Sequence, residues 1–524
     1  MITFSLPLNK FIITCCLILS VHCVFSQQWA GISGSNYAGI YSVHNNPANV
    51  VDSRYKLFLN IAGNDVFEGN NYFSYNAPFP FLGFIRNSVG PQYRNAQGKI
   101  IFKDSYIETS SNGAPYHSNT TGDAKGPSII YTINNKSAIA AYTRLRYAVN
   151  LNGINNSLAD LITRSTNRPG LIGQKVDVSE SALNANVYAE MGLTYGHVLM
   201  NNEENFFKFG VTVKRVVGLY NVHIIVDKGN YEIVRDNKDP NRNNIQINSI
   251  QGSYGYTMDE SFKNAKIDPQ WALGGLPAGS GFGLDLGFVY EYRPDYKKYI
   301  RRSSGTATLD PTQNKYEFKL GVSLLDFGSV RYNNGDLNYH FEMNQTNRLL
   351  TYQNFQDLNG YNDAFQRINN SLGLNNREIK FSSSLPTTLQ VNFDYHIRGK
   401  YYVNTMWSQS LRKSQSIGMT VPSSFSVTPR MEHKWYEIAV PISLLDNYNI
   451  FTMGLAGRAG PVFMGSDNLP GLLSIGKPRG LDFYFGVFVP VFRKPPSLPN
   501  ACWYEIPEKR PLKDRLMFWK KRKY

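Results

Sequence analysis

The strongest constraint on this chain is a strict alternation of apolar and polar residues that recurs along most of its length. Over residues 183–199, one face carries leucine, alanine, valine, methionine and tyrosine, and the other carries mainly asparagine, glutamate, threonine and glycine. A period of two is that of a β-strand. The same pattern recurs over residues 207–219, 281–292, 315–324, 387–396, 400–407, 435–444, 451–460 and 481–492. Many runs exceed the roughly 5–6 residues of a soluble strand and match the roughly 9–11 that a tilted membrane strand needs.

Composition separates the remaining fold classes. No apolar run of about 18 residues occurs after the first thirty positions, which excludes a bundle of membrane helices. The mean hydropathy of −0.33 still permits a membrane barrel, because alternating strands average out. A soluble β-sandwich or propeller would also alternate, but no repeat of about 40–50 residues is visible. We therefore predict an all-β fold, a transmembrane antiparallel β-barrel of about 14 strands with an N-terminal lumenal segment and long extracellular loops.

The connections also alternate in length, as barrels require. Residues 134–136, 201–205 and 398–400 are short turns, and 63–125, 220–280 and 328–384 are long loops. The literal count is 13 strands. Because both ends should lie on one side, we predict 14 and place the error between residues 423 and 480. Within the loops we expect a helix at 156–164, a hairpin of 222–226 with 231–234, and a fold of 77–84 onto the barrel mouth.

The ends of the chain indicate export. Lys10 precedes the apolar stretch 11–21, so residues 1–26 read as a cleaved signal peptide. His22 before Cys23 disfavours a lipoprotein. Cys502 is then the only mature cysteine, which excludes internal disulfides and thiolate metal sites. The predicted parts are the signal, a plug or hatch segment at 27–54, the barrel at 55–493 and a basic periplasmic tail at 494–524.

Positive charge is concentrated in that tail. The tail contains nine basic and three acidic residues, a net charge of +6, out of +14 for the whole mature chain. For an exported protein this favours outer-membrane lipid or a periplasmic or envelope protein as partner, and disfavours nucleic acid. The residues predicted to bind such a partner are Lys509, Arg510, Lys513, Arg515, Lys520, Lys521, Arg522 and Lys523.

Recognised catalytic and nucleotide-binding motifs are absent from the sequence. Charged residues on the polar strand faces are expected to compensate one another inside the barrel. This predicted lumenal network comprises Glu190, Lys208, Lys214, Asp285, Glu291, Glu317, Lys319, Asn392, Asp394, His396 and Asp482. One alternative is a lipid hydrolase in which Asp394 orients His396 and a serine such as Ser408 attacks. We expect no catalytic residues, metal or cofactor, and a protein that is not an enzyme.

Several short sequence segments resemble those of a known protein family. Residues 35–39 (SNYAG), 46–48 (NPA), 52–56 (DSRYK), 320–328 (LGVSLLDFG) and 465–468 (GSDN) together resemble an uncharacterised family of Bacteroidota outer-membrane proteins. The Asn-Pro-Ala segment before the first strand also resembles, more distantly, the fatty-acid-transporter barrels and the PorV-type barrels of type IX secretion. Those barrels have 14 strands and an N-terminal segment in the lumen. The resemblance implies that Asn46, Pro47 and Ala48 belong to a plug.

The functional expectation is a non-enzymatic barrel in the outer membrane. It would serve as a conduit for a hydrophobic or small solute, or as an accessory of a cell-envelope or secretion complex. The lipid hydrolase and a purely structural envelope protein stay as alternatives.

Overall fold

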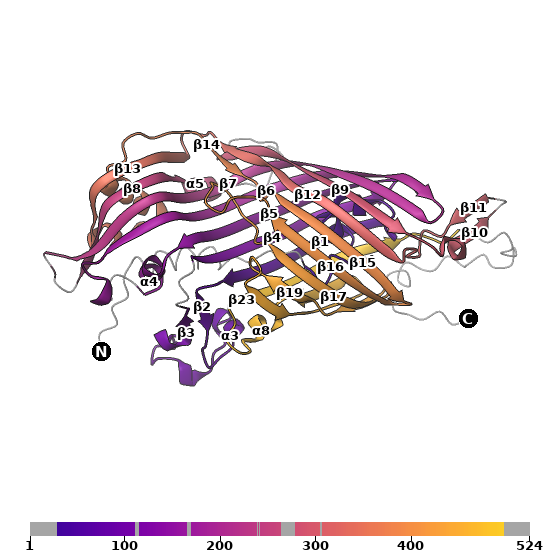
Figure 1. The fold of residues 1–524 in the computed structure, drawn as a ribbon, viewed down its shortest axis with the longest axis horizontal. Coiled ribbons are helices and arrows are strands. Elements are labelled where there is room, and N and C mark those ends of the chain that lie inside the picture. The colour runs from indigo at the N-terminus through magenta and orange to yellow at the C-terminus, as the bar shows by residue number, and fades with distance from the viewer. Residues whose placement is uncertain are drawn as a thin grey trace.

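A closed antiparallel barrel dominates the computed structural model, which describes residues 29–110, 115–164, 169–237, 239, 242–263, 278–303 and 306–496 (Figure 1). Fourteen strands form the wall, and the last pairs with the first through Tyr55 opposite Phe492. Closure leaves no unpaired edge along the wall. The wall strands are β1 (Tyr55–Asn70), β4 (Tyr116–Thr132), β5 (Ser137–Ile154), β6 (Lys175–Asn202), β7 (Asn205–Arg235), β9 (Gly279–Tyr292), β12 (Phe318–Tyr332), β15 (Thr388–Arg398), β16 (Tyr401–Ser410), β17 (Ser424–Glu432), β18 with β19 (Tyr436–Ala439, Ile442–Leu445), β20 with β21 (Ile450–Met453, Leu455–Ala459), β22 (Val462–Ser466) and β23 (Gly480–Phe492).

The prediction of 14 strands is confirmed, and the region between residues 423 and 480 explains why it is hard to count. Two of its strands are interrupted, one at Pro441 and one at Gly454, and the Gly454 amide donates to the Pro441 carbonyl across the two breaks. β22 has only five residues and β17 contains Pro429, which has no amide to donate. Short and broken strands weaken the alternating pattern on which the count depends.

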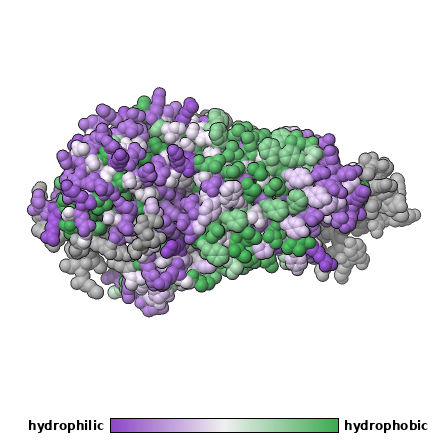
Figure 2. Space-filling view, viewed as in Figure 1, coloured by the Kyte–Doolittle hydropathy of each residue, from purple (hydrophilic) through white to green (hydrophobic). Residues whose placement is uncertain are grey.

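Alternation gives the barrel two chemically different faces. Leu193, Phe282 and Phe451 point outward and are 69%, 64% and 75% exposed, whereas their polar neighbours are buried in the lumen. On the face seen in Figure 2, apolar residues form a green band across the middle of the molecule, between two hydrophilic ends. An exposed apolar band around a closed barrel is the surface of a membrane-spanning β-barrel. No helix among the described residues combines the length and the apolar character that a membrane crossing requires.

One end of the barrel carries an additional sheet, which we call the outer sheet. The 28 residues of β6 and the 31 of β7 run beyond the apolar band. There β7 pairs with β8 (Asn243–Thr257), which in turn pairs with β13 (Asn338–Leu350) (Figure 1). The predicted hairpin of 222–226 and 231–234 is wrong. Residues 227–230 stay extended because β6 and β8 bond them from both sides, with Lys228 opposite Ser179 and Gln251.

Smaller elements cover the two ends. The predicted helix at 156–164 is confirmed as α4 (Asn156–Arg164). Residues 77–84 lie in a lobe with α3 (Phe81–Ile85), whose first amide donates to Ser474 beside α8 (Leu469–Leu473). The remaining short elements are β2 (Phe73–Tyr75), β3 (Ile107–Thr109), β10 (Ile300–Ser303), β11 (Thr306–Leu309), β14 (Phe381–Ser384), α2 (Ile40–Val43), α5 (Glu260–Lys263), α7 (Tyr361–Leu372), and the 3-10 turns η1 (Pro47–Val50), η2 (Pro91–Tyr93), η3 (Asp104–Tyr106), η4 (Pro169–Leu171), η5 (Tyr296–Tyr299) and η6 (Tyr352–Phe355).

The outer sheet holds a buried histidine pair. His223 Nε2 lies 3.0 Å from His340 Nδ1, His223 Nδ1 lies 2.7 Å from Asn221 Oδ1, and Glu342 faces His340 from the far side at 3.2 Å. The Phe381 ring packs on both imidazoles. Burial first, and then the neighbouring His340, hold the pKa of His223 well below its ordinary value. The folded sheet therefore resists protonation of His223.

We expect the outer sheet to lose stability in acid. A histidine whose folded pKa lies below its unfolded value, about 6.5, binds a proton more readily when the sheet opens, so stability falls as the pH drops below about 6.5. The protection factors of amides in β8 and β13, which correct for the slower intrinsic exchange in acid, should be lower at pH 5 than at pH 7.5. His223→Gln should remove most of that difference, and an equal pH dependence in this variant would contradict the assignment to His223.

Candidate functional site: the occupied barrel lumen

Residues 29–54 lie inside the barrel, and we call them the lumenal segment. They contain α2 and η1; most of the 26 residues are buried and none is exposed. The segment begins near β23, where the Ala30 and Gly31 amides donate to Asp467 and Trp29 stacks on Tyr484 at 5.5 Å. It ends at the end of the barrel where the short turns lie, which we call the rim. There Arg54 donates to the Pro311 carbonyl. The segment thus crosses much of the lumen before the chain enters β1.

Asn46, Pro47 and Ala48 sit in a recess of the wall formed by glycines. Gly196, Gly210 and Gly287 face one another on β6, β7 and β9, and a Cβ atom on any of them would collide with the lumenal segment. At Gly210 the collision would be with the Pro47 and Ala48 backbone. Within the recess the Asn46 amide donates to the Phe288 and Val322 carbonyls at 3.1 and 3.2 Å. Glycine on the polar strand faces is therefore what lets this backbone touch the wall.

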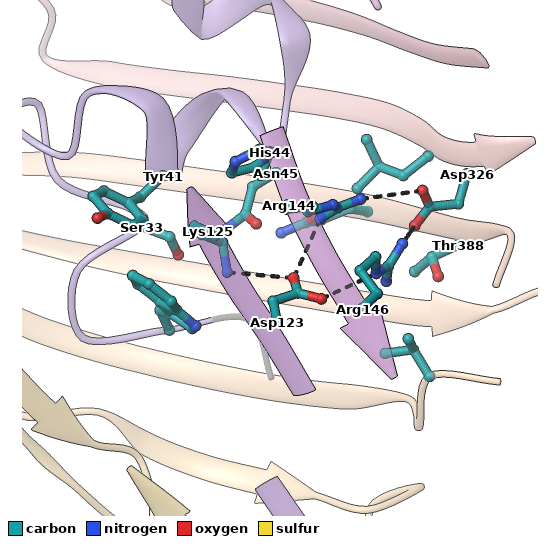
Figure 3. A pocket seen from close by; sticks show the side chains of 14 residues that line it. Ser33, Tyr41, His44, Asn45, Asp123, Lys125, Arg144, Arg146, Asp326 and Thr388 are labelled. Atoms are coloured by element: carbon teal, nitrogen blue, oxygen red, sulfur yellow. Dashed lines mark hydrogen bonds and ion pairs between the residues drawn. The ribbon is translucent and has the colours of Figure 1, made fainter. Parts of the chain in front are cut away.

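Beside α2 the lumen contains a cluster of buried ion pairs, which we call the central cluster (Figure 3). Asp123 binds Lys125, Arg144 and Arg146, with the shortest contact 3.1 Å to Arg146 Nε. Asp326 binds the same two arginines and also Lys214. Buried charges of this kind are stable only when paired and hydrogen-bonded. The cluster is completed by Asp65, Glu190 and Asp285.

Asp326 reaches the cluster because of a β-bulge. The pairing of β12 with β9 shifts between Leu324 and Phe327, and Asp326 adopts φ +57°. Its amide donates to Asp285 at 2.7 Å. Such a bulge re-aims one side chain out of the regular alternation. Here it directs a carboxylate toward three cations.

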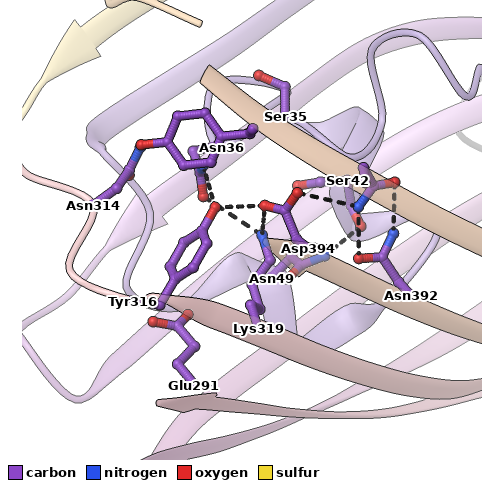
Figure 4. A network of polar contacts seen from close by, with 12 residues as sticks. Ser35, Asn36, Ser42, Asn49, Glu291, Asn314, Tyr316, Lys319, Asn392 and Asp394 are labelled. Atoms are coloured by element: carbon purple, nitrogen blue, oxygen red, sulfur yellow. Dashed lines mark hydrogen bonds and ion pairs between the residues drawn. The ribbon is translucent and has the colours of Figure 1, made fainter. Parts of the chain in front are cut away.

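A second network surrounds Asp394 nearer the tight-turn end (Figure 4). Arg430 donates to both oxygens of Asp394, at 2.6 and 2.8 Å, and Tyr316 donates a third hydrogen bond. Lys319 lies 3.6 Å from the same carboxylate. The network continues to the lumenal segment, since Asn36 bonds Tyr316 and Glu432. A third group at the rim joins Asp52 to Arg293, Glu291 and Lys208.

Most residues of the predicted lumenal network lie in these groups. Glu190, Lys214 and Asp285 belong to the central cluster, Lys319 and Asp394 to the second network, and Lys208 and Glu291 to the rim. Asn392 exchanges hydrogen bonds with Asn404, and Asp482 accepts the Asp467 amide.

Two residues of that prediction lie elsewhere. Glu317 is exposed at the tight-turn end, because the regular strand begins only at Phe318. His396 lies at the β15–β16 turn, where Nε2 contacts the Gly399 carbonyl at 3.1 Å and the ring stacks on Tyr402.

The geometry separates the residues of the hydrolase alternative. Ser408 pairs with Gln390, whereas His396 pairs with Tyr402, six residues further along β16. At about 3.3 Å per residue this is a separation of roughly 20 Å. Asp394 is engaged by Arg430 rather than by His396. The predicted signal peptide and the eight basic tail residues lie outside the described residues.

Sequence reasoning missed several lumenal residues, among them Arg144, Arg146, Asp123, Lys125 and Asp326. Arg144 and Arg146 do occupy alternate positions in an alternating strand, which is a usable signal. Asp123 and Lys125 fall within residues 63–125, predicted as loop, but β4 begins at Tyr116. Asp326 depends on the bulge, which the alternating pattern does not reveal.

Three cavities lie along the lumen, and two of them are lined in part by the lumenal segment. The largest, of about 510 Å³, opens at the long-loop end and we call it the vestibule; a cavity of about 70 Å³ lies beside the central cluster, and one of about 50 Å³ lies on the rim side. Val421 lines both the vestibule and the central cavity. Ser33, Asn45 and Gln390 line both the central and the rim cavity. The three spaces therefore follow one another through the barrel.

These features define a class: a closed, membrane-spanning β-barrel whose lumen is occupied by its own N-terminal segment. Within that class the chain belongs to a family of unknown function, DUF5723, whose model matches residues 47–467. The predicted membership of a domain-of-unknown-function family is confirmed. No curated protein matches the sequence.

The solved structures that match this chain include a hydrocarbon channel, a FadL homologue and a toluene transporter. A deletion mutant of the TodX monoaromatic hydrocarbon channel has 6% identity and a TM-score of 0.36, covering 88% of this chain and 97% of its own. A FadL homologue from Pseudomonas aeruginosa has 10% identity and a TM-score of 0.26, with coverages of 86% and 94%. The P. putida toluene transporter TodX has 9% identity and a TM-score of 0.29, with coverages of 90% and 99%.

Proposed function

We propose that the protein is a non-enzymatic outer-membrane conduit for a small solute, in which the lumenal segment is a plug that moves to open the path. The observation that carries this is the series of three cavities. The vestibule, the central cavity and the rim cavity are separated by side chains of Val421, Gln390, Ser33 and Asn45, and the last two belong to the lumenal segment. Moving that segment would join the central and rim cavities and would leave Val421 as the residue between them and the vestibule.

The seat of the segment is suited to a movable plug. In the glycine recess it is held by contacts with backbone atoms and by the two Asn46 hydrogen bonds. The central cluster, in contrast, joins wall strands to one another, since Asp123, Arg144, Arg146, Lys214 and Asp326 all belong to β4, β5, β7 and β12. These ion pairs between wall strands would therefore stay in place when the segment moves.

A second support concerns chemistry. In the hydrolase alternative, Ser408 lies roughly 20 Å from His396 along the strand, and Asp394 is engaged by Arg430 rather than by His396. Polar cavities favour a small polar solute over a hydrophobic one. Action as an accessory of an envelope complex through the basic tail stays a prediction.

A disulfide lock tests the plug. A Cβ atom on Gly196 would lie 3.4 Å from Val51 Cβ, close to the Cβ separation of a disulfide. We expect the Val51→Cys, Gly196→Cys protein, in a Cys502→Ser background, to pass ion current in KCl across a planar bilayer only when reduced. Each single-cysteine variant should conduct equally in both redox states. Equal current from oxidised and reduced double variant, or none from either, would contradict a moving plug.

A further inference from the structure

We infer that the vestibule binds an uncharged, hydroxyl-rich solute, such as a short neutral oligosaccharide. This inference rests on the proposed function, since it names the class of solute that the conduit would bind first, in the vestibule. The cavity of about 510 Å³ lies within the range of small-molecule sites, about 300–1,000 Å³. Its lining is dominated by amide and hydroxyl side chains from β4, β5, β16 and the loop after β16.

One lining residue has an unused donor. Asn152 near the end of β5 is 7% exposed, and its Nδ2 has no hydrogen-bond partner within the described residues. A buried amide without a partner costs free energy, so such groups in native proteins commonly await a water or a ligand. Because Asn152 lines the vestibule, a hydroxyl oxygen of a bound solute can accept this hydrogen bond.

The ionisable side chains of the lining are already engaged. Arg412 donates to the Ser384, Ile417 and Met419 carbonyls, so its guanidinium holds its own loop in place. His117 Nε2 contacts Asp446 Oδ2 at 2.7 Å, and the other oxygen of Asp446 accepts from Asn119. Both terminal nitrogens of Arg412 are thus taken up by neutral oxygens of its own loop and of Ser384, which leaves a ligand carboxylate no bidentate partner there. A desolvated ligand charge would be costly there.

Amides match sugar hydroxyls in a specific way. A hydroxyl both donates and accepts, and an asparagine or glutamine side chain does the same with two donors and one carbonyl oxygen. Gln415 in the loop after β16 is only partly buried and makes no hydrogen bond within the described residues. Gln415 and Asn152 both line the vestibule, and each can therefore hydrogen-bond a polyhydroxyl ligand.

Saturation-transfer NMR on the purified full chain in detergent tests the inference with maltotriose and cellotriose as probes. At least one of these neutral trisaccharides should give protein-dependent signals. Asn152→Leu should weaken binding about tenfold, the value of one lost hydrogen bond, and Gln415→Ala should weaken it as well. Asn248→Leu in the outer sheet is the matched control, since the Asn248 amide is bound to Asn230 outside the cavity, and it should bind normally.

Charged analogues separate the remaining outcomes. Maltotrionic acid and a glucosamine trimer should bind more weakly than the neutral sugars. Preferential binding of the acid would overturn the inference in favour of an anion site at Arg412, and binding that is unchanged by both vestibule variants would overturn it too. Absence of sugar binding together with redox-controlled current would refute this inference while leaving the plugged conduit intact.

Discussion

Lys214→Met is expected to cause the largest loss of stability of any single substitution in the lumen. Lys214 is 1% exposed and its ammonium lies 2.6 Å from Asp285, with Asp326 as a second partner. Removing it leaves two buried carboxylates without that cation. Breaking a buried ion pair in this way typically costs about 3–5 kcal/mol. The urea midpoint of unfolding in detergent should fall clearly, and the barrel should lose its heat-resistant mobility on gels at a lower temperature.

The chain provides a matched control. Lys298 and Asp295 form an ion pair with the same distance, 2.6 Å, but their side chains are 70% and 60% exposed. Exposed pairs contribute little, because water and salt screen them. Lys298→Met should leave the urea midpoint unchanged. Equal effects of the two substitutions would mean that the central cluster does not brace the wall.

Gly210→Val is expected to displace the lumenal segment and open the barrel. A side chain at this position would collide with the Pro47 and Ala48 backbone, which cannot rotate away as a side chain could. Overpacking of this kind costs about 1–3 kcal/mol, which corresponds to a shift of roughly 5- to 150-fold from seated to displaced segment. Ion current across a planar bilayer should rise accordingly, while the barrel stays folded.

Gly457→Val is the control for the Gly210→Val substitution. Gly457 lies on β21, and a Cβ atom there would meet only the Glu437 carbonyl oxygen at 3.8 Å. Its conductance should match that of the unmodified protein. If Gly210→Val also conducts no better, the segment is either held more firmly than the glycine recess suggests or is not the barrier.

The barrel follows from the sequence because its signal is local. Two-residue alternation fixes which side chains face lipid, and this holds for β6, β9 and β23 without knowledge of their partners. The sequence-based prediction fails where the conformation of a segment depends on the strands that pair with it. Residues 227–230 have turn composition but stay extended because two long strands bond them. β22 is too short to show a pattern.

Only part of the lumenal site could be predicted from the sequence. Charges at alternate positions of long strands, such as Glu190 and Lys214, can be assigned to the lumen from parity alone. Parity fails at Glu317, which precedes the regular strand, and at Asp326, which a bulge re-aims. Which residues meet across the lumen cannot be read from parity at all. Arg430 and Asp394 lie on strands separated by another strand, so their pairing depends on the curvature of the wall.

The N-terminal end of the lumenal segment is fixed by residues near the opposite end of the chain. Ala30 donates to Asp467, 437 residues later, and Asp467 accepts the Tyr484 hydroxyl on the strand that closes the barrel. Contacts of such long range form slowly, because most of the chain must be ordered first. We therefore expect the N-terminal residues to reach their final contacts only when the last strand joins the sheet. Occupation of the lumen and closure of the wall would then be completed together.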